Sequence, residues 1–366
     1  MVRWEGFSVC SVQAARLAQH LPAVMRNQMR RSFPRSSFLA IPAAAVLALA
    51  GCSGAAVEQT DTRTLVLSLN QTEEHPSFIA LEQFGDRLSE RTGGRLDVEV
   101  YPNETLGAQQ EVVQLVGDGA VDMAVVSGTQ MENLSTGFQV LNLPTVFDDI
   151  DHQLSVINDD AVVGELFASL EDSHNLTVLG GLTQGSRHIY TKEGPIERPE
   201  DLAGMKIRVQ ESDIAIDMIN AMGASATPMA YGEVYTALQS GVLDGAENNE
   251  ISYMSQNHNE VAKHMSLTNH LVGLDYVVMS ADLLKGMSEQ DRQIFEEEWV
   301  AASEHHAELW TTQTETAIDE AIESGTITTE PDRQAFDEAL QPVVEKYLES
   351  PQDREVYESI REAADQ

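Results

Sequence analysis

The chain has 366 residues with 42% hydrophobic side chains, and its 59 acidic residues against 22 Lys and Arg give a formal net charge of −37. This length favours two domains, and the hydrophobic fraction supports packed cores and excludes a disordered protein. Nucleic acid is not expected as a partner, because phosphate binding needs clustered Lys and Arg. The acidity indicates an adaptation for solubility, for example in salty surroundings, with an acidic surface for a basic partner as the alternative.

The amino-terminal segment resembles a bacterial lipoprotein signal peptide. A positive stretch begins at Met29, residues 38–50 are apolar but too short to cross a membrane, and the sequence Leu-Ala-Gly-Cys ends at Cys52. This resemblance implies cleavage before Cys52 and a diacylglycerol on its sulfur, with a plain signal peptide as the alternative. The predicted segments are a signal peptide at 1–51, of which 1–28 is an upstream mis-start, and a lipidated tether at 52–63.

Cleavage there would leave Cys52 as the single cysteine of the mature protein, because Cys10 precedes the predicted site. No disulfide is then possible within the mature chain, so its stability must come from a large core. A lipid on Cys52 predicts an extracytoplasmic protein attached to the outer face of the cytoplasmic membrane, either periplasmic or at the cell surface.

Strands and helices alternate from residue 64 onwards, as in α/β proteins with a largely parallel sheet. The first alternation predicts strands at 64–69, 96–101 and 121–126, a helix from 75 to 93 and a second helix around 112–116. After Gly180-Gly181, a second alternation predicts strands at 188–191 and 206–209 and helices at 213–222 and 232–240.

One long helix is predicted after Ser288, because an acidic residue three places later is typical of a helix start and no Pro or Gly follows before Gly325. About 36 residues at 1.5 Å each would span about 54 Å, which exceeds one ordinary domain. This helix is therefore expected to bridge two lobes.

Motifs of catalysis and of cofactor binding are absent from the sequence. There is no Walker loop, no G-x-G-x-x-G after a strand, no G-x-S-x-G and no H-E-x-x-H. His258, His264 and His270 recur every six residues, a spacing that does not place them on one helical face. Neither a metal nor a cofactor is expected, and an enzyme is not the preferred interpretation.

Arg208 is the most informative residue, because it lies inside the short apolar strand predicted at 206–209. A buried arginine needs an anionic partner, and in so acidic a chain the partner can come from the protein or from a ligand. The carboxylate of a small molecule is the preferred partner. Forty residues later, Asn248 and Asn249 are expected in a loop after a helix.

Several short blocks resemble the solute-binding proteins of tripartite ATP-independent periplasmic (TRAP) transporters. They occur in family order between residue 64 and the end of the chain, and include Leu106-Gly107, Lys206-Ile-Arg-Val209, Thr227-Pro-Met229, Gly232-Glu-Val-Tyr235 and Asp244-Gly-Ala-Glu-Asn-Asn249. The resemblance implies an α/β, two-lobed, periplasmic-binding-protein-like fold with mixed sheets flanked by helices. The expected lobes are 64–184 plus about 274–313, and 185–273 plus about 314–366.

The same resemblance implies roles for individual residues. Arg208 matches the arginine that forks onto the ligand carboxylate, Asn248 matches an amide that hydrogen-bonds the ligand, and Arg187 matches a second arginine used by part of the family. Asn249 stands where most members have Pro, and the Glu-Asn-Asn version is associated with binders of sugar acids, especially uronates. The alternative for Arg187 is a surface arginine, and for both Asn residues it is turn chemistry.

Further residues are expected at the cleft because they follow strands or lie near its rim: Asn70, Ser127, Gln210, Glu211, Tyr231, Glu74, His75 and Gln109. For Glu74, His75 and Gln109 the alternatives are helix capping and a solvated loop, and for Tyr231 the alternative is a core position. His270 is expected to be structural, near the hinge.

The preferred function is a lipid-anchored binding protein that captures a small organic acid, best a hexuronate, and delivers it to the membrane permease subunits of a TRAP transporter. A dicarboxylate, a keto acid or an ectoine-like zwitterion is the alternative within the family, and an Arg187 that pointed into the cleft would favour the diacid. A secreted enzyme acting on acidic sugars is the alternative of another class, with Glu211 and Glu247 as its one candidate acid–base pair. The third interpretation is a sensor that presents its liganded form to a membrane receptor.

Overall fold

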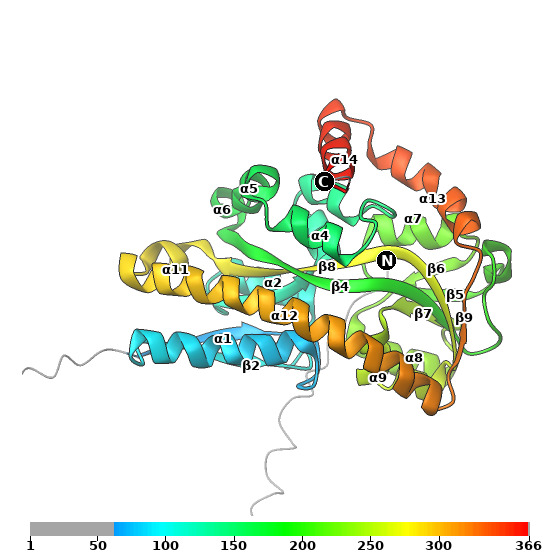
Figure 1. The fold of residues 1–366 in the computed structure, drawn as a ribbon, viewed down its shortest axis with the longest axis horizontal. Helices are drawn as coiled ribbons and strands as arrows, with labels where there is room; N and C mark the ends of the chain where they lie inside the picture. The colour runs from blue at the N-terminus through cyan, green and yellow to red at the C-terminus, as the bar shows by residue number, and fades with distance from the viewer. Residues whose placement is uncertain (1–61, 365–366) are drawn as a thin grey trace, which may run out of the picture. The chain divides into compact units, whose positions relative to one another are not determined.

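A mixed sheet of nine strands organises residues 62–364, the part of the chain that this computed structural model describes (Figure 1). The strands follow the order β2-β1-β3-β8-β4-β7-β5-β6, and β9 (Ile327–Thr329) pairs with β8. Helices flank this sheet, as the α/β interpretation predicted. The predicted signal peptide and nearly all of the predicted tether lie outside the described residues.

The first group of strands is parallel and is connected by helices. Its members are β1 (Arg63–Ser68), β2 (Leu96–Tyr101) and β3 (Met123–Ser127), with α1 (Pro76–Thr92) and α2 (Gln109–Gly117) between them. His75 begins α1 by accepting a hydrogen bond from the Ser77 amide, and Gly93 ends it in the left-handed conformation, with φ of 64°. These elements confirm the first predicted alternation.

The second group of strands is also parallel. Its members are β5 (Lys206–Val209), β6 (Ser225–Pro228) and β7 (Gly245–Asn248), with α7 (Asp213–Ala221) and α8 (Val234–Ser240) between them. The Ser212 hydroxyl caps α7, and Gly241 ends α8 with φ of 77°. The prediction that Asn248 lies in a loop was wrong. It ends strand β7, which is too short and too polar to show a period-2 pattern.

Two long antiparallel strands, β4 (Leu176–Thr191) and β8 (His264–Ser280), run through both groups. The carboxyl half of β8 pairs with β3, and the carboxyl half of β4 pairs with β7. The sequence predicted only the end of β4 at 188–191, because Gly180, Gly181 and Gly185 are typical of strand breaks. In the fold Gly180 and Gly185 leave room for tryptophans: a Cβ on Gly180 would lie 2.8 Å from Trp299 Nε1.

Helix α12 (Glu289–Glu323) is 35 residues long and confirms the predicted bridging helix. It contacts α1 beside the first group, β4 at the centre and α9 (Glu250–Ser255) beside the second group (Figure 1). On α1, the Phe84 ring meets Phe295 edge to face, with centroids 5.2 Å apart. The Ser288 side chain caps the first turn of α12 by accepting a hydrogen bond from the Asp291 amide. No helix among residues 62–364 has both the length and the apolar character needed to cross a membrane.

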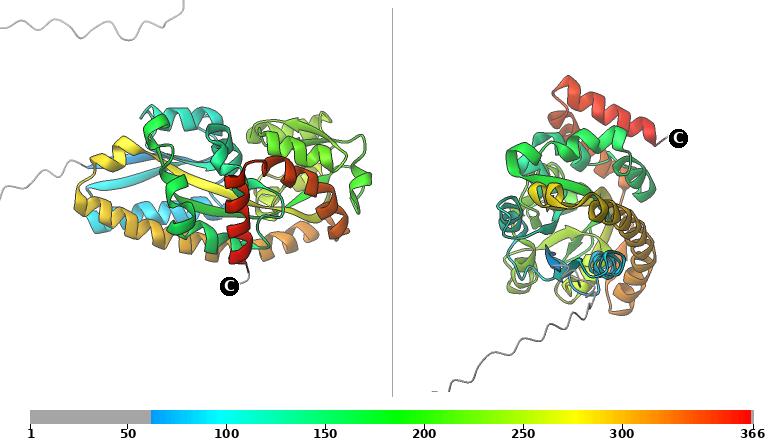
Figure 2. Two further views of the ribbon diagram at one scale, coloured as in Figure 1. Left: turned by 90° about the horizontal axis from the view of Figure 1, so that it is seen from above. Right: turned by 90° about the vertical axis from the view of Figure 1, so that its left-hand side faces the viewer.

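The carboxyl-terminal helices touch both groups. Helix α13 (Arg333–Tyr347) packs on α7, whereas α14 (Pro351–Ala363) packs on α4 (Ile150–Ile157), as the colours at the end of the chain in Figure 2 allow the reader to follow. His152 Nε2 lies 2.8 Å from the Ile360 carbonyl oxygen. Residues 314–366 therefore contact elements of both predicted lobes, and the predicted lobe boundaries stay a prediction.

The remaining elements are short. They are α3 (Gly128–Leu134), η1 (Thr136–Phe138), η2 (Val140–Asn142), α5 (Asp160–Ala168), α6 (Glu171–His174), η3 (Pro199–Leu202), η4 (Tyr231–Glu233), α10 (His258–Val261) and α11 (Ala281–Gly286).

Gly185 offers a test of how tightly α12 is fitted to β4. Its φ is +62°, and an added Cβ would lie 2.5 Å from Nε1 of the buried Trp310. Gly194 is the matched control, because its φ is +78° but an added Cβ would meet nothing within 4 Å. Backbone strain should cost each Ala variant about 1–2 kcal/mol, and overpacking should cost Gly185→Ala a further ~1–3 kcal/mol. Urea unfolding measures both, and equal losses would contradict the predicted contact.

Candidate functional site

Seven of the predicted site residues line one pocket, where the carboxyl ends of β1, β3 and β5 meet. They are Asn70, Gln109, Ser127, Arg208, Gln210, Glu211 and Tyr231. Asn70 follows β1, Ser127 ends β3, and Gln210 follows β5. Ligands of open α/β sheets bind beyond the carboxyl ends of strands, so this pocket is the candidate site.

Arg208 supplies the positive charge of this pocket although its side chain is almost buried, with 3% exposed. Its Nε and Nη2 donate to the Met229 carbonyl oxygen at 3.0 and 2.7 Å, and its guanidinium lies 5.7 Å from the centre of the Tyr231 ring. No acidic side chain among residues 62–364 lies within 4.0 Å of it. Burial lowers the pKa of Arg208, and the charge of Glu247 offsets only part of this effect.

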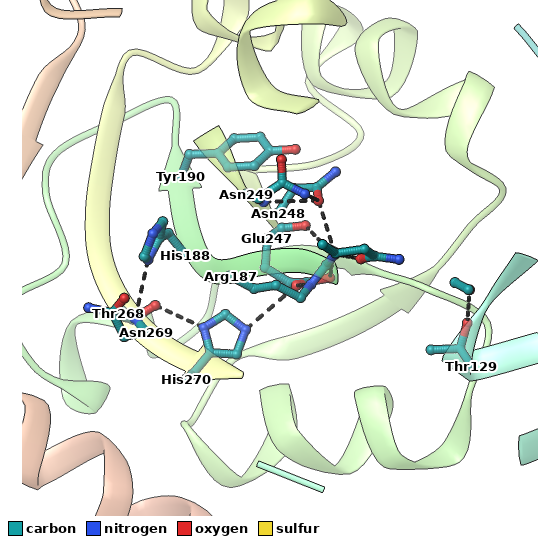
Figure 3. Close-up of polar contacts among 12 residues, drawn as sticks. Thr129, Arg187, His188, Tyr190, Glu247, Asn248, Asn249, Thr268, Asn269 and His270 are labelled. Atoms are coloured by element: carbon teal, nitrogen blue, oxygen red, sulfur yellow. Dashed lines mark hydrogen bonds and ion pairs between the residues drawn. The ribbon is translucent and has the colours of Figure 1, made fainter. Parts of the chain in front are cut away.

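Arg187 is buried nearby, with 2% exposed, but unlike Arg208 it is paired with an acidic side chain (Figure 3). Its Nε and Nη2 form a two-pronged ion pair with Glu247 at 2.6 and 2.8 Å, and Nη2 also donates to the Glu247 carbonyl at 3.2 Å. Its Nη1 donates to Gln184 at 2.5 Å and to Asn248 at 3.0 Å. All five guanidinium donors are thus taken by the protein, which leaves none free for a ligand carboxylate.

The acid of this pair is held ionised. Burial alone would raise the pKa of Glu247, but the charge of Arg187 and hydrogen bonds from His270 and Arg187 outweigh it and hold the pKa at about 2. His270 Nε2 lies 3.5 Å from Glu247, and its Nδ1 lies 2.8 Å from the Thr268 hydroxyl. Burial lowers the pKa of His270, which fits the structural role that was predicted for it.

Asn248 connects the Arg187–Glu247 pair to the pocket. Its Oδ1 accepts from Arg187 (Figure 3), and its Nδ2 donates to the Tyr231 hydroxyl at 3.5 Å. Asn249 instead caps helix α9, because its side chain accepts from the Ser252 amide at 2.8 Å. The side-chain amide of Asn249 therefore acts as a helix cap.

Five predicted residues lie outside the lining of the pocket: Arg187, Asn248 and Asn249, described above, and His75 and Glu74. His75 is buried at the start of α1, where its ring meets Trp310 edge to face at 5.5 Å, and burial lowers its pKa to about 3. Glu74 is exposed. Helix capping, which was the alternative for His75, accounts for its position. Gln109 does line the pocket and also accepts from the Ser127 amide at 3.2 Å.

A second cavity adjoins the pocket and shares Gln210 with it. Arg187 and Glu247 line this second cavity together with Glu132, whose pKa burial raises to about 7. Glu211 lines the first pocket and Glu247 the second, so the one candidate acid–base pair of the enzyme interpretation is not brought together. Glu247 is also fixed as a carboxylate, and a general acid at neutral pH needs a proton to give.

Several lining residues were not predicted: Glu104, Ala108, Gln110, Gln130, Met229 and Ala230. Glu104 and Gln110 lie beside the Leu106-Gly107 block, and Met229 ends the Thr-Pro-Met block, so proximity to these blocks is the signal that could have suggested them. The Arg187–Glu247 pair had no such signal, because its partners are 60 residues apart.

Comparisons with known proteins agree with this geometry. The family described as bacterial extracellular solute-binding protein, family 7, matches residues 67–350. A solute-binding protein of Chromohalobacter salexigens is 36% identical over 276 residues, which cover 75% of this chain and 82% of that protein.

Solved structures are similar over most of the chain. A TRAP periplasmic solute-binding protein of Anaerococcus prevotii with bound D-glucuronate is 35% identical, with a TM-score of 0.80 over 82% of this chain and 98% of that one. One from Xanthobacter autotrophicus with bound β-D-galacturonate is 29% identical, with a TM-score of 0.77 over 81% and 98%. The two-lobed α/β fold is therefore shared with this group.

The substitution Glu247→Gln tests the buried ion pair. Removing one partner leaves the Arg187 charge buried without compensation, which should cost about 3–5 kcal/mol of unfolding free energy near pH 7. The depressed pKa adds stability that is complete above the ordinary carboxyl value of 4.5 and is lost as pH falls towards about 2. The gap between wild type and variant should therefore narrow below pH 4.5.

The control is Glu297→Gln, because Glu297 pairs with Arg91 at a site where 47% of the glutamate side chain is exposed. That change should cost less than about 1 kcal/mol. Equal losses for the two variants, measured by urea unfolding between pH 3 and 8, would show that the buried pair contributes nothing special.

Proposed function

This chain belongs to family 7 of the bacterial extracellular solute-binding proteins, the binding subunits of TRAP transporters, and on that basis we propose that its ligand is a hexuronate such as D-glucuronate. The observation that carries the proposal is Arg208, a buried cation that faces the pocket without an acidic partner among the described residues. Structures with bound D-glucuronate and galacturonate, at 29–35% identity, support the same ligand class.

The charge of the site favours a ligand with one carboxylate. Arg208 is the one cationic side chain in the lining of the pocket, and all five donors of Arg187 are committed to protein groups. A dicarboxylate would bring a second negative charge to a pocket that already contains Glu104 and Glu211. Dicarboxylates, keto acids and ectoine-like solutes are therefore the weaker alternatives.

The polar lining suits a polyhydroxy acid. In the proposed complex, the Arg208 guanidinium holds the carboxylate, and Asn70, Gln109, Ser127 and Gln210 pair with hydroxyl groups. Tyr231 forms a wall against the sugar ring, and Asn248 fixes Tyr231 from behind. Glu211, Asn249, Arg187, Glu74 and His75 act on the ligand only indirectly or not at all. The two lobes close around the ligand, and no covalent step occurs.

Of the two alternative functions, the enzyme fits the site less well and the sensor is separated by a test of transport. A secreted enzyme on acidic sugars would need a paired acid and base beside Arg208, whereas Glu247 is consumed by Arg187. A sensor that presents its liganded form to a membrane receptor would use the same pocket. Turnover of the bound sugar acid would favour the enzyme, and binding without transport by the permease would favour the sensor.

Arg208 should decide binding. We expect Arg208→Ala to weaken D-glucuronate binding by at least about a hundredfold, because a two-pronged, charge-assisted contact is worth roughly 1.5–3 kcal/mol per hydrogen bond. Arg208→Lys should recover little, since a point charge cannot form the fork. For wild type, a ligand at 100 times its dissociation constant should add about 2.7 kcal/mol to stability, which a thermal-shift assay detects.

The control is Arg333→Ala, which removes an exposed arginine paired with Asp337 on α13 and should leave binding unchanged. The screen should include uronates, aldonates, dicarboxylates, keto acids and ectoine. A wild-type shift with a dicarboxylate but with no uronate would overturn the proposed ligand.

We also propose that the protein is a lipoprotein, anchored through Cys52 and delivering its ligand to the membrane permease subunits of its transporter. A Cys52→Ser variant should move from the membrane fraction to the soluble fraction and lose incorporation of a labelled lipid, since a diacylglycerol anchor holds a protein stably at the bilayer. Cys10→Ser is the control, because Cys10 precedes the proposed cleavage site. Unchanged fractionation of Cys52→Ser would favour a plain signal peptide.

A further inference from the structure

Glu104 is an acidic residue in the lining of a pocket for which we propose an anionic ligand. It follows β2, and together with Arg208 it lines the candidate site. Its carboxylate also reaches across to the second strand group, where Oε2 accepts a hydrogen bond from the Gly232 amide at 3.1 Å. A Cβ at position 232 would lie 2.7 Å from that oxygen, so any larger residue would have to displace the end of the Glu104 side chain.

A second contact joins the same two parts of the chain. Asn133 Nδ2 donates to the Glu211 carbonyl oxygen at 2.8 Å. Asn133 belongs to α3 and Glu211 follows β5, so this bond, like that of Glu104, bridges the first and second strand groups. The Glu104 carboxylate is thus positioned where the two parts of the site meet.

The backbone at Glu104 is strained. Asn103 and Glu104 have φ of 60° and 54°, in the left-handed region that favours glycine and that asparagine tolerates better than glutamate does. Hydrogen bonds from the Asn103 amide to Gln71 and from the Glu104 amide to Leu69, at 3.0 and 3.2 Å, fix the turn. Glycine would satisfy this backbone at lower cost, so the reason for glutamate must lie in its side chain.

An ionised carboxylate can only accept hydrogen bonds. It repels a ligand carboxylate that comes close, but it accepts well from a hydroxyl group. In a sugar acid, Arg208 would hold the single carboxylate, and the hydroxyls further along the molecule would offer donors to the remaining lone pairs of Glu104. An unsubstituted four-carbon diacid such as succinate offers no hydroxyl donor and carries a second negative charge.

We propose that Glu104 is the specificity-determining residue of this site: it accepts a hydrogen bond from a ligand hydroxyl, rejects a second carboxylate, and joins the two strand groups through Gly232. This inference rests on the proposed function, since it assumes a sugar acid on Arg208. It adds a reason why a neutral polar lining alone would not separate uronates from diacids.

Isothermal titration with D-glucuronate and with succinate tests the proposal. Glu104→Gln keeps an acceptor for Gly232 but removes the charge, so D-glucuronate binding should weaken about tenfold and the preference over succinate should shrink by at least that factor. Glu104→Gly should weaken D-glucuronate binding about a hundredfold while its melting temperature stays level or rises, because the strained turn is relieved.

The matched control is Glu73→Gln. Glu73 accepts from the Asn103 side chain at 3.0 Å in the same loop but does not line the pocket. It removes the same charge, so any general gain in anion affinity appears in both variants and can be subtracted. The control should bind both ligands within about twofold of wild type.

The outcomes separate the two hypotheses. If the wild type binds D-glucuronate and the Glu104 variants keep the same affinity and the same preference over succinate, the role of Glu104 is overturned. The proposed function then still stands. Wild type that binds succinate but not D-glucuronate would overturn both.

Discussion

The candidate site depends on two buried arginines, one paired with an acidic side chain and one without an acidic partner among the described residues. Arg187 is neutralised by Glu247 and has every donor occupied, whereas Arg208 donates to the Met229 carbonyl and has no acid within 4.0 Å among the described residues. A buried charge without a counter-ion is costly, by several kcal/mol. In a chain with net charge −37, an acid for Arg208 would be easy to supply, so its absence leaves the charge available to an anionic ligand.

The ion pair of Arg187 keeps Arg208 without an acidic partner. Glu247 is close enough for its charge to act on the pKa of Arg208. The two-pronged pair with Arg187 holds the Glu247 side chain in place, so it cannot turn to neutralise Arg208. Asn248, the next residue, links this pair by hydrogen bonds to Tyr231, which lines the pocket. The buried ion pair thus serves specificity, by deciding which arginine stays open to a ligand.

Continuous elements position these groups. Strands β4 and β8 pass through both strand groups, and helix α12 runs beside them. Arg187 lies on β4 next to register shifts between Thr183 and Ser186 and between Arg187 and Ile189. Any opening of the pocket must act on these continuous strands and on α12, because no flexible linker separates the groups within residues 62–364. The irregular stretch of β4 is where such a change would meet least resistance.

Local signals in the sequence predicted much of this fold correctly. Ser288 and the acidic first turn of α12, the glycines that end α1 and α8, and the apolar strands β1 and β5 all act within a few residues, so their effects are visible in the sequence. Only the end of β4 was predicted, because Gly180 and Gly185 are typical of breaks, while here they make room for Trp299 and Trp310, more than 100 residues away.

For the site, the sequence by itself determined the chemistry near the strand ends: Asn70 and Gln210 follow strands, Ser127 ends one, and Arg208 lies next to the last residue of another, and ligands of α/β proteins bind beyond the carboxyl ends of strands. It could not determine which arginine is paired, because any of 59 acids could have been the partner. The tertiary structure decided that by placing Glu247 on the strand beside Arg187 and by bringing Glu104 to Gly232. Ion pairs depend on distances in space, and those distances are set by packing between elements far apart in the chain.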